Sequence, residues 1–143
     1  IVTIGDLARS GVKLAIAAPG APLGADSRSF LERATANGQF GQEYAQQALA
    51  NVVAQPETDP DLVNLVIQGQ VDAGITYLGS ALRAGPTQVS AIEIPEEIYA
   101  QATFYFGALS ASQQTGLAQQ FIDFIFSETG QEIIIRSGLI PVQ

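Results

Sequence analysis

The stretch GQVDAGITYLGSAL (residues 69–82) joins a short apolar strand to the start of a helix. Residues 71–77 (VDAGITY) lie between two turn-forming glycines and contain β-branched residues, a pattern that predicts a short buried strand. The residues that follow, GSALRAG, predict a short helical turn. The strand therefore ends in Tyr77, and a phenol hydroxyl lies where a core strand gives way to a turn.

Strand and helix patterns alternate on both sides of this stretch. Strands are predicted over residues 12–20 (VKLAIAAPG), 71–77, 89–95 and 102–110. Helices are predicted after Asp26, Gly41, Asp59, Gln113 and Ser127. The helix after Gly41 is expected to give way to a strand near Val52. This alternation predicts an α/β domain with a mixed, mainly parallel sheet flanked by helices.

The predicted helix ends rest on capping residues. Asp26 is placed at the N-cap of the first long helix, which stops at Gly38. Asp59 is placed at the N-cap of a later helix, with Pro60 at its first position. Ser127 is expected to cap the last helix.

Composition excludes several classes of partner. The chain has 143 residues, 47% of them hydrophobic, which is enough for one compact domain with a core. Six Lys and Arg residues against fourteen Asp and Glu residues give a net charge of -8. Nucleic acid and anionic membrane surfaces are therefore not expected as partners. A small anion is still compatible with this charge, because backbone N–H groups at helix starts can bind it without a cation.

The sequence does not favour an enzyme. It has no His and no Cys, and neither a G-x-S-x-G nor a phosphate-binding P-loop motif is present. The single lysine, Lys13, lies at a strand start, and Glu93, Glu96 and Glu97 lie in a turn beside Pro95, where exposure to solvent explains them. We therefore expect no catalytic residues, no cofactor and no residues that bind a metal cation directly.

Two strand-to-helix junctions offer backbone donors for an anion. In APGAPLGADS (residues 18–27), Gly20 and Gly24 allow a tight turn, and the N–H groups near Leu23 could converge at the helix start. Asp59 enters the helix at the second junction. Ligands of open α/β sheets bind outside the carboxyl ends of the strands, where Tyr77 also lies. Taken singly, a glycine-rich turn, a helix cap and a core-edge tyrosine also explain these features.

Three segments carry a resemblance to a known family. DLARSGVKLAIAAPGAPLGADSRSFLE, GQVDAGITYLGSAL and QQFIDFIFSETGQEIIIRSGLIPV together resemble the periplasmic molybdate-binding proteins of ABC transporters, which are type II extracytoplasmic solute-binding proteins. The C-terminal pattern F-x-x-F-x-x-S-x-x-G-Q-x-I-x-x-x-x-G is shared more widely among solute-binding proteins. The resemblance extends over nearly the whole chain.

The resemblance implies a two-lobed protein of which this chain is one part. Residues 1–110 would form the second, ligand-binding lobe, and residues 111–143 would form C-terminal helices that pack on a first lobe with no counterpart here. The apolar face formed by Phe121, Phe124 and Ile125 would then fold back or pair with another copy of the chain. The chain opens without Met, so we expect a processed protein or a fragment, with a signal peptide upstream and a periplasmic or extracytoplasmic location.

The resemblance also implies a ligand and its contacts. Molybdate or tungstate would be bound by backbone N–H groups at Leu23, beside Gly24, and at Asp59, and by the Tyr77 hydroxyl. The partner would be the permease of an ABC importer. Two alternatives remain: a solute-binding protein for sulfate, phosphate or another small solute, and a ligand-sensing effector domain of a transcription regulator. The family pattern has a small or apolar residue where this chain has Asp59.

Overall fold

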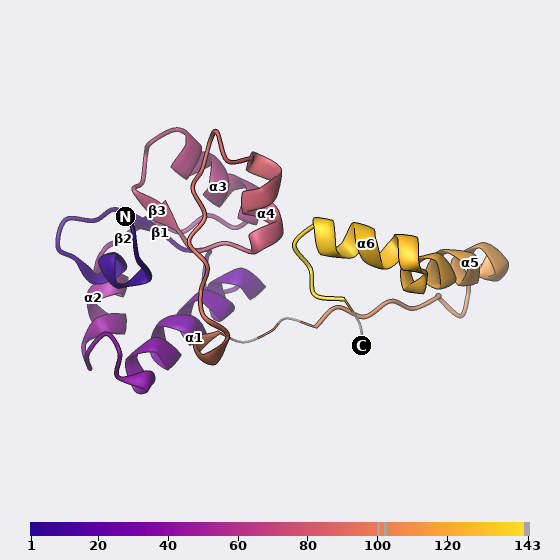
Figure 1. Ribbon diagram of the computed structural model, residues 1–143, viewed down its shortest axis with the longest axis horizontal. Coiled ribbons are helices and arrows are strands. Elements are labelled where there is room, and N and C mark those ends of the chain that lie inside the picture. The colour runs from indigo at the N-terminus through magenta and orange to yellow at the C-terminus, as the bar shows by residue number, and fades with distance from the viewer. Residues whose placement is uncertain (100, 102, 142–143) are drawn as a thin grey trace. The chain divides into compact units, whose positions relative to one another are not determined.

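The computed structural model describes residues 1–99, 101 and 103–141 (Figure 1). The chain forms two compact units, Ile1–Ala100 and Gln101–Gln143. The first unit contains the sheet, and the second contains two helices.

The first unit is an α/β fold, as predicted. Its described elements are η1 (Ile4–Ala8), β1 (Leu14–Ala15), α1 (Pro22–Asn37), α2 (Tyr44–Ala50), β2 (Val52–Ala54), α3 (Asp59–Ile67), β3 (Ala73–Gly74), α4 (Leu78–Ala84) and η2 (Glu96–Ile98). The three strands are parallel, in the order β2-β1-β3, with Leu14 paired to Val52 on one side and to Ala73 on the other.

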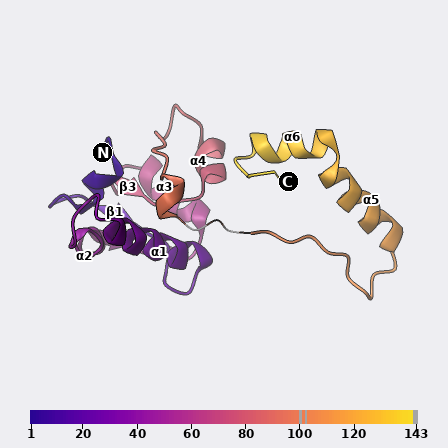
Figure 2. The same cartoon turned by 60° about the horizontal axis from the view of Figure 1, so that its bottom comes forward.

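The sheet is covered on both faces, because alternate residues of the segment around β1 point to opposite sides. Leu14 and Ile16 belong to a core cluster with residues of α1 and α2, whereas Ala15 and Ala17 belong to a second cluster with Leu62 of α3. Figure 1 shows α3 above the strands, α4 to their right, and α1 and α2 below them, and Figure 2 shows α1 and α2 side by side. The central strand is therefore apolar on both faces, as expected for a parallel sheet with helices on each side.

Two predicted helix caps are wrong. Helix α1 begins at Pro22, so Asp26 lies inside its second turn and does not cap it. The fixed φ of proline suits the first turn of a helix, which explains the earlier start. Helix α3 is capped by Thr58, whose Oγ1 accepts a hydrogen bond from the Asp61 N–H at 3.3 Å. The predicted cap Asp59 is instead the first residue of α3. The predicted stop at Gly38 is confirmed, with a positive φ of 79°.

Two predicted strands are also wrong. Residues 89–95 form no strand, and neither do the described residues between 103 and 110. In the second segment the side chain of Tyr105 is 90% exposed, and Phe104 and Phe106 are exposed as well. Residue 102 lies outside the described residues. Alternation of apolar residues predicts a strand only if a neighbouring strand pairs with it, and the paired strands of the described chain are β1, β2 and β3.

The second unit contains α5 (Thr115–Phe126) and α6 (Glu128–Arg136), which are joined at Ser127. Ser127 caps α6 as predicted, because its Oγ accepts a hydrogen bond from the Gly130 N–H at 3.2 Å. Phe121 and Phe124 are exposed, as expected for the apolar face of α5, but Ile125 is only 8% exposed. The side chain of Gln131 donates to the Ile125 carbonyl at 2.8 Å, which ties the first part of α6 to the end of α5.

No helix in the described part of the chain is both long and apolar enough to cross a membrane.

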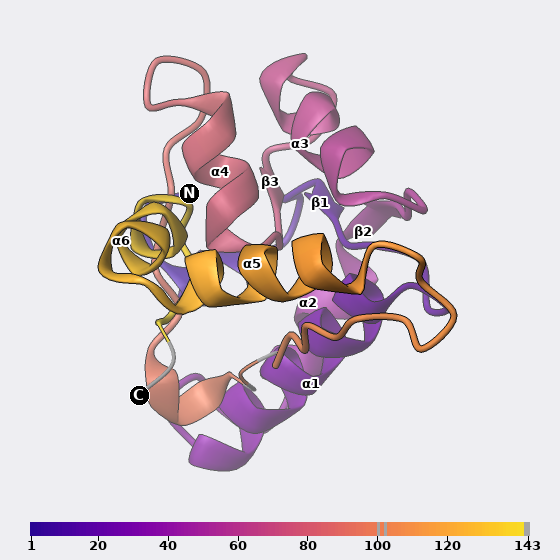
Figure 3. The same ribbon diagram turned by 90° about the vertical axis from the view of Figure 1, so that its right-hand side faces the viewer.

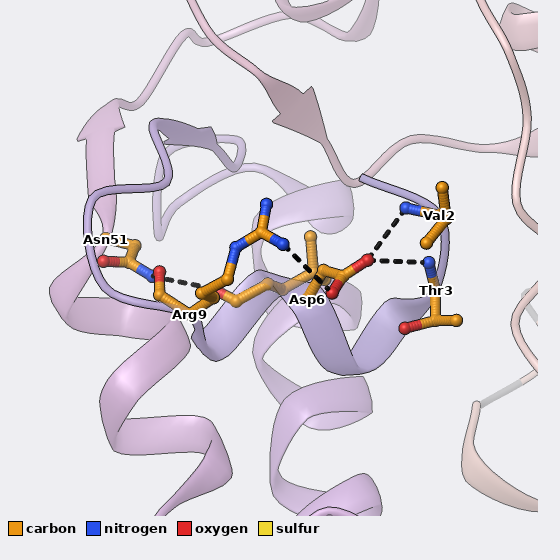
Figure 4. Close-up of polar contacts among 6 residues, drawn as sticks. Val2, Thr3, Asp6, Arg9 and Asn51 are labelled. Carbon is orange, nitrogen blue, oxygen red and sulfur yellow. Dashed lines mark hydrogen bonds and ion pairs between the residues drawn. The ribbon is translucent and has the colours of Figure 1, made fainter.

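The N-terminal turn is held by side-chain hydrogen bonds to the backbone (Figure 4). The Asp6 carboxylate accepts hydrogen bonds from the N–H groups of Val2 and Thr3 at 2.8 and 3.0 Å, and Arg9 lies 3.6 Å from it. The side chain of Asn51 donates to the Arg9 carbonyl at 2.8 Å, which ties η1 to the end of α2. The hydrogen bonds from Val2 and Thr3, followed by the charge of Arg9, hold the pKa of Asp6 below its ordinary value.

This lowered pKa predicts a pH dependence of stability. A carboxyl group whose folded-state pKa is lower than its unfolded-state pKa stabilises the fold above the unfolded pKa, and this stabilisation is lost as the pH falls through the folded pKa. We expect the free energy of unfolding of Asp6→Asn to fall less steeply between pH 5 and pH 2 than that of the unchanged protein. Urea unfolding at several pH values measures both slopes. Glu32→Gln, at an exposed position of α1, serves as the control. Equal slopes for Asp6→Asn and the unchanged protein would contradict the prediction.

Candidate functional site

All three strands lead into helices at the same edge of the sheet. β1 is followed by α1, β2 by α3 and β3 by α4, and the strands are parallel, so their carboxyl ends lie together. Figure 3 shows α3 and α4 side by side at the sheet. Leu23, Asp59 and Tyr77 each follow a different one of these strands. The structure therefore brings the predicted binding residues to one edge, where open α/β sheets bind ligands.

Leu23 and Gly24 are the second and third residues of α1. The Gly24 N–H donates to the Ala21 carbonyl at 2.9 Å, and the Ala25 N–H donates to the same carbonyl at 3.1 Å. These two groups are therefore used within the first turn of the helix. Among the described residues the Leu23 N–H has no hydrogen-bond acceptor, as expected for a group at a helix start. One backbone donor of this turn thus remains for a ligand.

Asp59 is the first residue of α3, and its N–H likewise has no acceptor within the described chain. Its carboxylate accepts hydrogen bonds from the hydroxyls of Thr76 and Ser80, which lie on either side of Tyr77 in the sequence. The guanidinium of Arg83 donates to the Ser80 Oγ at 2.6 Å. The Asp59 side chain therefore links the start of α3 to the β3–α4 junction. Pro60, which follows it, has no N–H to offer.

Tyr77 is the N-cap residue of α4 and is partly buried. Its hydroxyl donates to Oδ2 of Asp26 at 2.7 Å. Burial raises the pKa of the Tyr77 phenol, and the hydrogen bond to Asp26 and the negative charges of Asp26 and Asp59 raise this pKa further. Tyr77 therefore stays protonated at neutral pH and acts as a hydrogen-bond donor. Leu23 and Tyr77 also belong to the same apolar cluster, which brings the first and third junctions together.

The site contains two carboxylates and no paired cation. Within the described ranges the ion pairs are Arg9–Asp6 and Arg136–Glu132, so neither Asp26 nor Asp59 is ion-paired. Arg28 lies on the same helix as Asp26 but donates to the carbonyls of Gly24 and Ala17 at 2.9 and 3.3 Å. No group of three His, Cys, Asp or Glu side chains suited to a metal ion occurs in the described chain.

Four polar residues at this edge are not among the residues that the sequence predicts to bind a ligand. Asp26 was placed at a helix N-cap, and Thr76, Ser80 and Arg83 were not singled out, although Thr76 and Ser80 flank Tyr77 in the stretch that ends the strand. Two hydroxyl residues so close to a strand end were the available signal. A cavity of about 180 Å³ lies between α3 and α4; Ser80 and Arg83 line it, whereas Leu23 and Tyr77 do not.

The fold defines a class of protein: an α/β lobe in which the carboxyl ends of three parallel strands lie at one edge of the sheet. Residues 1–140 match the family of bacterial extracellular solute-binding proteins, and the chain belongs to this family. The predicted α/β fold and the family resemblance are thereby confirmed.

Curated relatives and solved structures agree with this assignment. The chain is 29% identical over 138 residues to the molybdate-binding protein ModA of Mycobacterium bovis, and equally to that of Mycobacterium tuberculosis. These alignments cover 96% of this chain and 48% of each relative, so the chain spans about half the length of the curated relatives it matches.

The fold is similar to that of two solved PEB3 structures. The structure of PEB3 bound to L-phospholactate has a TM-score of 0.72 and 20% identity, and that of PEB3 from Campylobacter jejuni has a TM-score of 0.69 and 20% identity. Each comparison covers 96% of this chain and 58% of the PEB3 chain. At this identity the similarity describes the fold.

Proposed function

We propose that this chain is part of the solute-binding component of an ABC importer and that its ligand is a tetrahedral oxyanion, molybdate or tungstate. The observation that carries the proposal is the meeting of three donors at one edge of the sheet: the Leu23 N–H, the Asp59 N–H and the Tyr77 hydroxyl. The similarity to molybdate-binding proteins over 96% of the chain supports the choice of ligand.

The proposed site works with neutral donors. The N–H groups at the starts of α1 and α3 lie at the positive ends of two helix dipoles, which favour an anion. A partly buried phenol hydroxyl binds an anion more strongly than the same group in water, because hydrogen bonds to charged acceptors strengthen at low dielectric. A site without cations also leaves no buried positive charge when it is empty.

The remaining donors would come from a first lobe. We propose that residues 1–110 form the second lobe and that residues 111–143 pack on the first, through the exposed side chains of Phe121 and Phe124. Pairing of this face with a second copy of the chain is the alternative. The proposed protein acts in the periplasm or outside the cytoplasm and delivers its ligand to a membrane permease.

A phosphorylated carboxylic acid is the second candidate ligand. The solved structure with a TM-score of 0.72 is a complex of PEB3 with L-phospholactate, and a phosphate group presents the same tetrahedral arrangement of oxygens as molybdate. Inorganic phosphate and sulfate are also tetrahedral oxyanions and are smaller than phospholactate.

A thermal-shift titration with molybdate, tungstate, sulfate, phosphate and phospholactate tests the proposal. A ligand present at about 100 times its Kd stabilises the folded state by about 2.7 kcal/mol. We expect a shift with molybdate and tungstate, both in this chain and, more strongly, in the full-length polypeptide. A shift with phospholactate alone would select the second candidate, and no shift in the full-length polypeptide would reject both.

Tyr77→Phe is expected to weaken molybdate binding about tenfold, because it removes one hydrogen bond to a charged ligand. Isothermal titration calorimetry of the full-length polypeptide measures the Kd. Tyr105→Phe is the matched control, since the Tyr105 side chain is almost fully exposed. An unchanged Kd for Tyr77→Phe would remove Tyr77 from the site.

A further inference from the structure

The partner of the Tyr77 hydroxyl is itself an anion. Asp26 lies in the second turn of α1, and its Oδ2 accepts a hydrogen bond from the Tyr77 hydroxyl, 51 residues later in the sequence, at an O–O distance of 2.7 Å. Both residues are partly buried, and Asp26 has no ion-pair partner within the described chain. The carboxylate therefore occupies the donor that the proposed ligand requires.

A phenol hydroxyl has a single proton and donates one strong hydrogen bond at a time. A carboxylate and an oxyanion are both charged acceptors, so they compete for this proton. They also repel each other at short range, and the partly buried surroundings weaken the screening of this repulsion. An oxyanion that reaches Tyr77 must therefore displace the Asp26 carboxylate.

We propose that Asp26 is a built-in competitor of the ligand: its carboxylate holds the Tyr77 hydroxyl in the empty protein and takes it back when the ligand leaves. The inference rests on the proposed function and adds a residue that sets the affinity of the site. Asp26 lowers the affinity for an oxyanion and speeds its release, and it keeps the Tyr77 hydroxyl hydrogen-bonded when no ligand is present.

Asp59 does not have this role. The negative charge of its carboxylate also raises the pKa of the Tyr77 phenol. The two oxygens of this carboxylate, however, accept hydrogen bonds from the hydroxyls of Thr76 and Ser80. These hydroxyls hold the carboxylate at the β3–α4 junction, so the Asp59 group proposed to contact the ligand is its backbone N–H. The competitor role therefore falls on Asp26 alone of the two carboxylates.

A double-mutant cycle on the full-length polypeptide tests the inference. Asp26→Asn keeps the shape and an acceptor oxygen but removes the charge, so we expect molybdate to bind about tenfold more tightly and to dissociate more slowly. In the Tyr77→Phe background the same change is expected to have a clearly smaller effect, because no hydroxyl remains to compete for. Glu32→Gln, on the same helix and with the same change in charge, is expected to leave the Kd unchanged.

A measurement without ligand shows whether the Tyr77–Asp26 hydrogen bond exists in the unchanged protein. Asp26→Asn is expected to lower the pKa of the Tyr77 phenol. An NMR titration measures this pKa, and the signal that is missing in Tyr77→Phe identifies Tyr77. Molybdate binding that is unchanged or weaker in Asp26→Asn, with the phenol pKa lowered, overturns the competitor role and leaves the proposed function intact. Failure of the unchanged protein to bind any tested oxyanion overturns both.

Discussion

Replacing Gly24 with alanine is expected to destabilise the first unit by about 3 kcal/mol, the upper part of the usual range for overpacked sites. A Cβ atom at this position would lie 2.0 Å from the Ala18 carbonyl oxygen and 2.6 Å from that of Ala17. Both are backbone atoms of the segment that directly follows the central strand, so they cannot move without shifting the backbone beside the sheet. In an ordinary helix the same change would be stabilising by up to about 1 kcal/mol, and the sign of the effect is therefore diagnostic.

Urea unfolding followed by circular dichroism measures this effect. Gly20→Ala is the matched control, because a Cβ atom at Gly20 meets nothing within 4 Å. The control is expected to unfold at nearly the same urea concentration as the unchanged protein. Equal stability of the two variants would show that the first turn of α1 does not lie against the strand end. Because Leu23 precedes Gly24, loss of this contact would also move the backbone donor of the site.

Replacing Gly130 with alanine is expected to open the turn between α5 and α6. A Cβ atom there would lie 2.1 Å from the Phe124 carbonyl oxygen and 2.7 Å from that of Ile125. We expect a local cost of about 3 kcal/mol, which corresponds to a loss of about 100-fold in amide-exchange protection along α6. Hydrogen exchange followed by NMR measures the protection of each residue. Gly116→Ala on α5 is the control, because a Cβ atom there meets nothing within 4 Å, and it should leave the amide-exchange protection along α6 unchanged.

The sequence predicted the parts of the fold that local chemistry determines. The apolar segment around Leu14, the stop at Gly38 and the cap at Ser127 are all found. Each depends on residues close in sequence. The strand predicted over residues 89–95 fails because strand formation depends on a hydrogen-bonding neighbour, which periodicity does not specify. The predicted helix cap at Asp26 is wrong because α1 begins four residues earlier, at Pro22, and the Asp26 side chain accepts a hydrogen bond from Tyr77 instead.

The candidate site was predictable in its backbone but not in its side-chain pairs. Leu23, Asp59 and Tyr77 follow the three strands and could be named from the order of elements. The bond between Tyr77 and Asp26 spans 51 residues, and that between Thr76 and Asp59 spans 17. Such pairs form only once α1 and α3 have packed on the sheet, so no local pattern in the sequence reveals them. Whether the three named residues bind a ligand stays a prediction.

The position of β1 has a consequence for the order in which the protein folds. This strand is the middle one of the sheet, yet both of its neighbours come later in the chain. During synthesis β1, with the buried residues Leu14 and Ile16 in and beside it, has no strand partner until β2 emerges and lacks its second partner until β3 emerges. Non-local pairing of this kind folds slowly and leaves apolar surface open to chaperones in the meantime. The sheet of the first unit therefore cannot be completed until residues 73–74 have been synthesised.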